Sequence, residues 1–186
     1  MAGYRQYHDE YHAIDVLHNC LEINSNNCSP ALLLAALYHD AVYVSGSTSN
    51  ELNSAQALIN DANCLAYHKY NIDFGIIHHA AELIKNTTID KHLTIGVVID
   101  RNLSTLLDAD LWSLSADYYE FINNQKNILK ENFLDPEDPI MLKKSAVFLK
   151  QFLKNRSYIY HTDYGREHWE NRARENILRL CKETGV

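Results

Sequence analysis

Apolar residues recur every three or four positions along most of the chain, with polar residues between them. This spacing is typical of amphipathic α-helices. Ile14, Leu17 and Leu21 show it near the N-terminus. Polar segments rich in Asn, Ser, Asp and Pro separate the periodic stretches and favour turns. The pattern predicts helices at 4–24, 30–44, 51–68, 71–85, 96–111, 115–133, 140–156 and 165–182.

Nothing in the sequence favours a β-sheet or a second domain. No segment shows a convincing alternation of apolar and polar residues, and no internal repeat or low-complexity linker is present. The 186 residues include only 6 Gly and 3 Pro, which leaves little turn chemistry for an all-β fold. A chain of this length can bury one sizeable core. We therefore predict an all-α fold in which residues 1–186 form a single helical bundle.

Charge and composition narrow the classes of function. The formal net charge of −7 argues against a general nucleic-acid-binding protein, which would carry a basic surface. No stretch approaches the roughly 20 apolar residues that a membrane span needs, and the polar N-terminus lacks the apolar region of a signal peptide. The 4 cysteines lie far apart in sequence, as in reduced proteins. We expect a cytoplasmic protein that binds neither nucleic acid nor membranes.

Two polar residues follow an apolar run in the predicted helix 30–44. His39 and Asp40 come after Tyr38 and residues 31–37, all of which are Leu or Ala. On a continuous helix both side chains would point into apolar surroundings, about 100° apart around the axis. An unpaired carboxylate in such surroundings is costly. Asp40 therefore needs a partner, which could be an arginine, a set of hydrogen-bond donors or a metal ion.

A second aspartate raises the same question near the end of the predicted helix 96–111. Asp110 lies three, four and seven residues after leucines, on the apolar stripe of that helix. Asp108 lies instead over Arg101 and Ser104, on a more polar face. We therefore predict that Asp110 is the buried carboxylate of this pair.

The first predicted helix supplies imidazoles. His8 and His12 are four residues apart and would share a face, and the other side of His12 is apolar. If His12, His39, Asp40 and Asp110 converge between helices, they offer two imidazoles and two carboxylates, a set suited to Mn²⁺, Fe²⁺, Co²⁺, Ni²⁺ or Zn²⁺. Hydrogen-bonded core histidines and a structural ion pair are the alternative, and spacing alone leaves both open.

Five short segments add a resemblance to a known family. They occur in the order RQYHDEYH (5–12), HDAVY (39–43), NELNSA (50–55), DADL (108–111) and ARENI (173–177). This H…HD…D order resembles the HD superfamily of metal-dependent phosphohydrolases, especially its small bacterial branch. The resemblance implies an HD-type helical bundle that hydrolyses a phosphoester. It also implies a divalent ion, Mn, Co, Ni, Fe, Zn or Mg, whose ligands are His12, His39, Asp40 and Asp110.

Four residues are candidates for the catalytic steps. Asp40 could orient a water molecule as well as hold the metal. Arg5 would share a helical face with His8 and suits a phosphate clamp, although a surface ion pair with Asp9 is equally compatible. His8 could act as an acid–base group or be a plain hydrogen-bonded histidine. Glu51 could be a general base or a substrate contact, or an acidic residue favoured at a helix N-terminus.

Three functions remain open from the sequence. The first is hydrolysis of a small phosphorylated substrate, with nucleotides among the candidates. The second is a non-catalytic sensor that binds a metal and a nucleotide. The third is an oxygenase or lyase, which would require further histidine ligands such as His78, His79 or His92. The chain departs from the family pattern around His92, Lys143 and Lys144, so we infer no inherited role for these three. The oligomeric state is not indicated.

Overall fold

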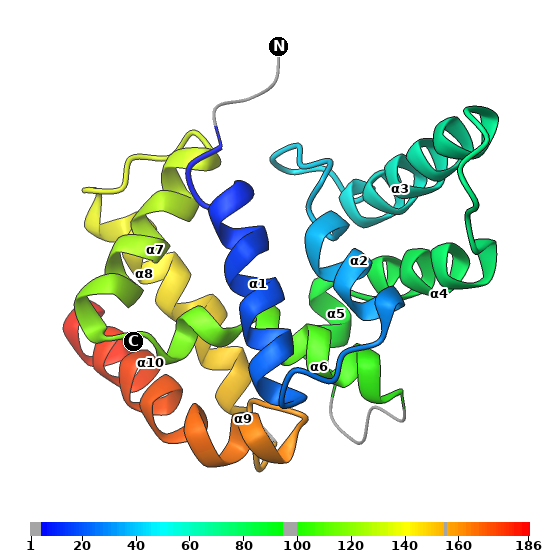
Figure 1. The fold of residues 1–186 in the computed structure, drawn as a ribbon. Coiled ribbons are helices and arrows are strands. Elements are labelled where there is room, and N and C mark those ends of the chain that lie inside the picture. The colour runs from blue at the N-terminus through cyan, green and yellow to red at the C-terminus, as the bar shows by residue number, and fades with distance from the viewer. Residues whose placement is uncertain (1–4, 95–99, 155) are drawn as a thin grey trace.

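The computed structural model describes residues 5–94, 100–154 and 156–186. Within these residues it contains ten α-helices, two short 3₁₀ helices and no strand, which confirms the predicted all-α class (Figure 1). The helices are α1 Glu10–Ile23, α2 Pro30–Tyr38, α3 Asn50–Tyr67, α4 Phe74–Lys85, α5 Ile89–His92, α6 Arg101–Asp110, η1 Trp112–Ser115, α7 Tyr118–Glu131, α8 Pro139–Leu149, η2 Lys150–Leu153, α9 Asp163–His168 and α10 Glu170–Thr184.

Two hydrophobic clusters organise these helices. The first gathers buried residues of α1, α2, α3, α4 and α6, including Leu32 and Ile84. The second gathers residues of η1, α7, α8, η2 and α10, including Phe121 and Ile177. Ile23, at the end of α1, packs against both clusters. Figure 1 shows α1 between the α3–α4 pair and the group formed by α7, α8 and α10. The division into domains stays a prediction.

Helix α1 starts later than the pattern predicts. The Asp9 side chain accepts hydrogen bonds from the backbone N–H groups of Tyr11 and His12, which makes Asp9 the N-cap and Glu10 the first helical residue. The predicted helix 4–24 is therefore wrong for residues 5–9, and residue 4 lies outside the described residues. Arg5 and His8 consequently do not share a helical face with His12.

Helix α2 ends at Tyr38, six residues before the predicted end. The His39 ring donates from Nδ1 to the carbonyl oxygen of Ala36 at 2.8 Å. In a continuing helix this carbonyl would accept from the backbone N–H of Asp40. The side chain thus replaces the backbone bond, and Asp40 lies in a turn. For this reason the two side chains do not diverge: His39 Nε2 and Asp40 Oδ2 are 3.1 Å apart.

Other predicted ends shift because side chains cap the helices. Asp73 caps α4, so the predicted helix 71–85 begins at Phe74. Asp100 caps α6, and the earlier part of the predicted helix 96–111 falls on residues 96–99, outside the described residues. The last two predicted helices are each divided, into α8 and η2 and into α9 and α10. No helix among the described residues is both long enough and apolar enough to cross a membrane.

Candidate metal centre

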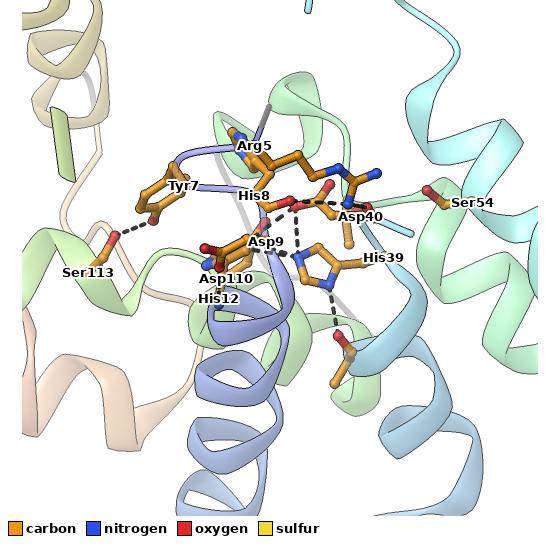
Figure 2. A network of polar contacts seen from close by, with 12 residues as sticks. Arg5, Tyr7, His8, Asp9, His12, His39, Asp40, Ser54, Asp110 and Ser113 are labelled. Atoms are coloured by element: carbon orange, nitrogen blue, oxygen red, sulfur yellow. Dashed lines mark hydrogen bonds and ion pairs between the residues drawn. The ribbon is translucent and has the colours of Figure 1, made fainter. Parts of the chain in front are cut away.

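Four side chains from three parts of the chain meet beside α1. His12 lies in the first turn of α1, His39 and Asp40 follow α2, and Asp110 is the last residue of α6. Figure 2 shows these side chains directed toward one another. One possible ligand atom from each residue lies within 4.8 Å of all the others, so the group could hold a metal ion. The structure therefore brings together the four predicted ligands.

The interatomic distances define a small polar centre. His12 Nε2 and His39 Nε2 are 3.3 Å apart, and His12 Nε2 lies 3.1 Å from Asp110 Oδ1. His39 Nε2 is also 3.5 Å from Asp110 Oδ1. Both imidazoles are buried, whereas the two carboxylate side chains are 18% exposed. Possible metal-ligand atoms of four residues thus surround one point, which can be approached from the side of the two carboxylates.

The orientation of His39 suits a metal ligand. Because a carbonyl oxygen only accepts, the bond to Ala36 assigns a proton to Nδ1 and directs Nε2 toward His12 and the carboxylates. A carbonyl that fixes the tautomer in this way is a common partner of metal-ligating histidines. Two imidazoles and two carboxylates form a mixed nitrogen and oxygen set appropriate to a divalent transition metal. The residues present therefore fit the predicted ion, whose identity they leave open.

The charges of the centre favour a cation. Burial alone would raise the pKa of Asp40, but the charge and hydrogen bond of His39 lower it to about 2. Burial opposes ionisation of Asp110 as well, yet bonds from His12, His39 and His92 hold the pKa of Asp110 well below its usual range. Burial would lower the pKa of His39, but the two carboxylates raise it well above its usual value. Positive charge between these groups, as a proton or a metal ion, is therefore strongly stabilised.

Asp108 has a different environment from the predicted one. It is fully buried, whereas Asp110 is the more accessible of the pair. Its carboxylate accepts three hydrogen bonds of 2.7 Å, from the backbone N–H of His161 and from the backbone and hydroxyl of Thr162. The prediction of a wetter face for Asp108 is wrong because the 161–162 segment covers that side of α6. Asp108 anchors the fold, and Asp110 faces the site.

Arg5 holds the turn that contains Asp40. Its guanidinium donates to the backbone carbonyls of Asp40 at 2.8 Å and Ala41 at 2.9 Å, and to the carbonyl of His8 at 3.1 Å. These bonds tie the segment before α1 to the turn after α2 (Figure 2). Arg5 does not line the cavity described below. Arg5, which we predicted to clamp a phosphate, therefore supports the turn of Asp40 instead. Arg5 forms no ion pair with Asp9.

The beginning of α3 holds the segment that follows this turn. The Asn50 amide accepts from the backbone N–H of Val44 at 2.9 Å and donates to its carbonyl at 3.1 Å. The Ser54 hydroxyl likewise accepts from the N–H of Val42 and donates to its carbonyl. Asn50 and Ser54 are buried and lie one turn apart on α3. The NELNSA segment thus fixes the path of the chain after Asp40.

His8 is paired with a glutamate that the sequence did not indicate. His8 Nδ1 lies 2.5 Å from Glu131 Oε2, and the His8 ring stacks on Tyr43 with ring centroids 4.1 Å apart. Burial alone would lower the pKa of His8, but the bond to Glu131 and nearby carboxylates raise it. Glu131 is buried at the end of α7. No local signal could reveal this pair, because 123 residues separate its members.

A cavity of about 490 Å³ adjoins the four-residue group. His39, Asp40 and Asp110 contribute to its wall, as do His8 and Glu51. This volume suits a small molecule. Glu51 lies in the first turn of α3 and is partly exposed. Of the predicted site residues, Arg5 and His12 do not line this cavity.

His92 is a further member of the centre. His92 Nε2 lies 2.9 Å from Asp110 Oδ2, whereas His12 contacts the other carboxylate oxygen, Oδ1. His92 is buried, lines the cavity and has no hydrogen-bond partner at Nδ1 in the structure. The sequence gave His92 no inherited role and named it only as a possible further ligand for an oxygenase or lyase. In contrast, His78 and His79 are exposed on α4, and among the described residues no other group of three or more His, Cys, Asp or Glu meets at a possible metal site.

Comparisons with known proteins provide no relative. No protein-family model matches the chain, and no curated protein or solved structure matches it. The likeness to the HD superfamily therefore rests on the five sequence segments.

Proposed function

We propose that this chain is a metal-dependent phosphohydrolase of the HD type, which cleaves a small phosphoester with the help of one divalent ion. One observation carries the proposal. Side chains in the order H…HD…D present four ligand atoms within 4.8 Å of one another, beside a cavity large enough for a small substrate. His12, His39, Asp40 and Asp110 would hold the ion.

The position of the cavity favours a catalytic over a structural metal site. Structural sites are closed by protein ligands, whereas catalytic sites leave a position for water or substrate. His39, Asp40 and Asp110 all reach the cavity wall, so a ligand there would meet the centre directly. When bound, a divalent ion would polarise a phosphoryl oxygen and lower the pKa of a water molecule.

The surrounding residues would orient the reactants and move protons. Asp40 would orient the attacking water, and Glu51 at the cavity wall would accept its proton. His8 would donate a proton to the leaving oxygen, held in position by Glu131 and Tyr43. Arg5 would act as a positioning residue, since it bonds to the backbone of Asp40.

The proposal also includes a cytoplasmic location, and it includes neither nucleic acid nor a membrane as a partner.

The test is turnover of a panel of phosphoesters and nucleotides by the purified protein, with Mn²⁺, Co²⁺, Ni²⁺, Fe²⁺, Zn²⁺ or Mg²⁺ supplied separately. We expect chelation to abolish hydrolysis and one or more of these ions to restore it. His39→Ala should lower the rate by orders of magnitude, because it removes a ligand. His78→Ala is the matched control and should retain full activity, since His78 is exposed on α4.

Two results would replace this proposal. If His39→Ala turns over substrate as fast as the wild type, the His39–Asp40 pair is structural and the mechanism is wrong. If the wild type is inert on the whole panel but binds a metal and a nucleotide tightly, the chain is a sensor instead of an enzyme.

A further inference from the structure

The cavity beside the metal centre has a mixed lining. The polar centre contributes Asp40 and Asp110. η1, α7, α8 and η2 contribute polar residues such as Ser113, Gln125 and Ser145, together with most of a group of apolar side chains that we call the apolar wall: Leu111, Leu114, Ile128, Phe148, Leu149 and Phe152. An apolar wall next to polar groups is the usual arrangement of a site that orients a partly apolar ligand.

Lys144 is the sole Lys or Arg that lines this cavity within the described residues. Lys144 is exposed. Among the residues that the structure describes, the lysines in ion pairs are Lys85 and Lys126, so Lys144 has no carboxylate partner. The neighbouring Lys143 does not reach the cavity and donates to the carbonyl of Gly185. The guanidinium of Arg5 is held by backbone carbonyls.

Lys144 also has a defined relation to the apolar wall. Phe148 follows it by four residues on α8, so the two side chains share one face of that helix. Both line the cavity, and Phe148 is 40% exposed. A ligand that reaches Lys144 can therefore contact the Phe148 ring as well.

The charges of the wall limit how much negative charge a ligand can carry. Three carboxylates, those of Asp40, Glu51 and Asp110, line the cavity. These three carboxylates already balance the three positive charges of one divalent ion and Lys144. Each phosphate group of a ligand adds negative charge beyond that balance, so a ligand with a single phosphate is disfavoured least.

We infer that the substrate is a phosphomonoester with one phosphate group and an apolar, aromatic organic group, with Lys144 contacting the phosphate and Phe148 the ring. This inference rests on the proposed function, and it defines the substrate class. Hydrolysis would break the phosphorus–oxygen bond of the ester, with water supplying the oxygen of the released phosphate and a proton for the released alcohol or phenol.

Calorimetric titration of the Mn²⁺-loaded protein with three non-hydrolysable probes tests this inference without relying on turnover. Benzylphosphonate has one phosphonate and a ring, methylphosphonate lacks the ring, and 1,3-propanediphosphonate has a second phosphonate in its place. We expect benzylphosphonate to bind about tenfold more tightly than methylphosphonate, the gain from burying an aromatic ring. The diphosphonate should bind more weakly than benzylphosphonate.

Variants on α8 separate the two contacts. Lys144→Gln should weaken benzylphosphonate and methylphosphonate by the same factor, because both carry the group that Lys144 contacts. Phe148→Ala should weaken benzylphosphonate alone. Lys143→Gln is the matched control and should bind all three probes as the wild type does.

The inference is overturned if the wild type binds benzylphosphonate no more tightly than methylphosphonate, prefers the diphosphonate, or binds benzylphosphonate equally well after both Lys144→Gln and Phe148→Ala. These outcomes are distinct from failure of the proposed function. A protein that binds the probes as expected but does not hydrolyse phenyl phosphate would keep the binding specificity and lose the assignment as a hydrolase.

Discussion

The two aspartates of the DADL segment contribute in different ways. Asp110 faces the metal centre, whereas Asp108 is buried against the 161–162 segment. We predict that Asp110→Ala abolishes metal binding. Asp108→Asn should retain the metal but lower the free energy of unfolding by about 1–3 kcal/mol, because the new amide cannot accept all three hydrogen bonds.

Metal content by mass spectrometry and urea denaturation of both purified variants check this pair of predictions. Loss of metal from Asp108→Asn with full metal in Asp110→Ala would show that the assignments are reversed.

The His8–Glu131 pair predicts a change in the pH dependence of activity. Glu131 raises the pKa of His8 through its hydrogen bond and charge, while burial opposes protonation. Glu131→Gln removes the charge, so the pKa of His8 should fall. If protonated His8 donates to the leaving group, the alkaline limb of the pH–rate profile should move to lower pH.

The measurement is kcat against pH for the wild type and Glu131→Gln, with Glu82→Gln, an exposed glutamate on α4, as the control. An unchanged alkaline limb in Glu131→Gln would exclude His8 as the proton donor.

Single residues also show what a sequence can and cannot reveal about the site. Helical spacing and residue type made the four residues that meet at the centre candidates, but they left a structural ion pair equally open. The resemblance to the HD superfamily was needed to name them as ligands. Glu131 and the partners of Asp108 were missed, since their contacts join positions 123 and 53–54 residues apart. The chain folds them together through helix packing that local patterns do not encode.

At the scale of elements, the turn after α2 depends on the start of α3. Asn50 pairs with both backbone polar groups of Val44. We predict that Asn50→Ala lowers the free energy of unfolding by about 1–3 kcal/mol, because these groups lose their partner. It should also weaken metal binding, since Asp40 belongs to the same loop between α2 and α3.

Asn53→Ala is the matched control, because Asn53 is exposed on the same helix. Thermal denaturation and Mn²⁺ titration of the two variants check the prediction. Equal stability and equal affinity in both variants would show that the Asn50 amide does not support the turn.

The helix boundaries illustrate a second limit of sequence patterns. Apolar periodicity located most elements, but side chains determined several of their ends. Asp9 starts α1, and the His39 ring ends α2 by taking the carbonyl of Ala36. Periodicity extended both helices too far, because it records which face is apolar and says nothing of which side chain competes for a backbone hydrogen bond.

At the scale of the whole molecule, the centre ties together α1, α6 and the turn after α2. An ion bound there should stabilise the fold, because it binds the folded chain and relieves repulsion between Asp40 and Asp110. At an ion concentration a hundred times Kd, the gain is about 2.7 kcal/mol. For a chain of this size the gain corresponds to a rise in Tm of roughly 5–10 °C.

Differential scanning calorimetry with Mn²⁺ and with chelator measures this shift, and Asp110→Ala serves as the variant without a complete site. The expected shift is present in the wild type and absent in Asp110→Ala. An equal shift in both would show that the stabilising ion binds elsewhere.

The most direct test of the central claim is the visible absorption spectrum of the Co²⁺-loaded protein, with inorganic phosphate added afterwards. An ion held by two imidazoles and two carboxylates and open to the cavity should give one Co²⁺ per chain and a ligand-field band that phosphate changes. His39→Ala should lack this band, while His78→Ala should match the wild type. A wild-type spectrum without such a band, or a band that persists in His39→Ala, would contradict the assignment of the His12, His39, Asp40 and Asp110 group as a catalytic metal centre.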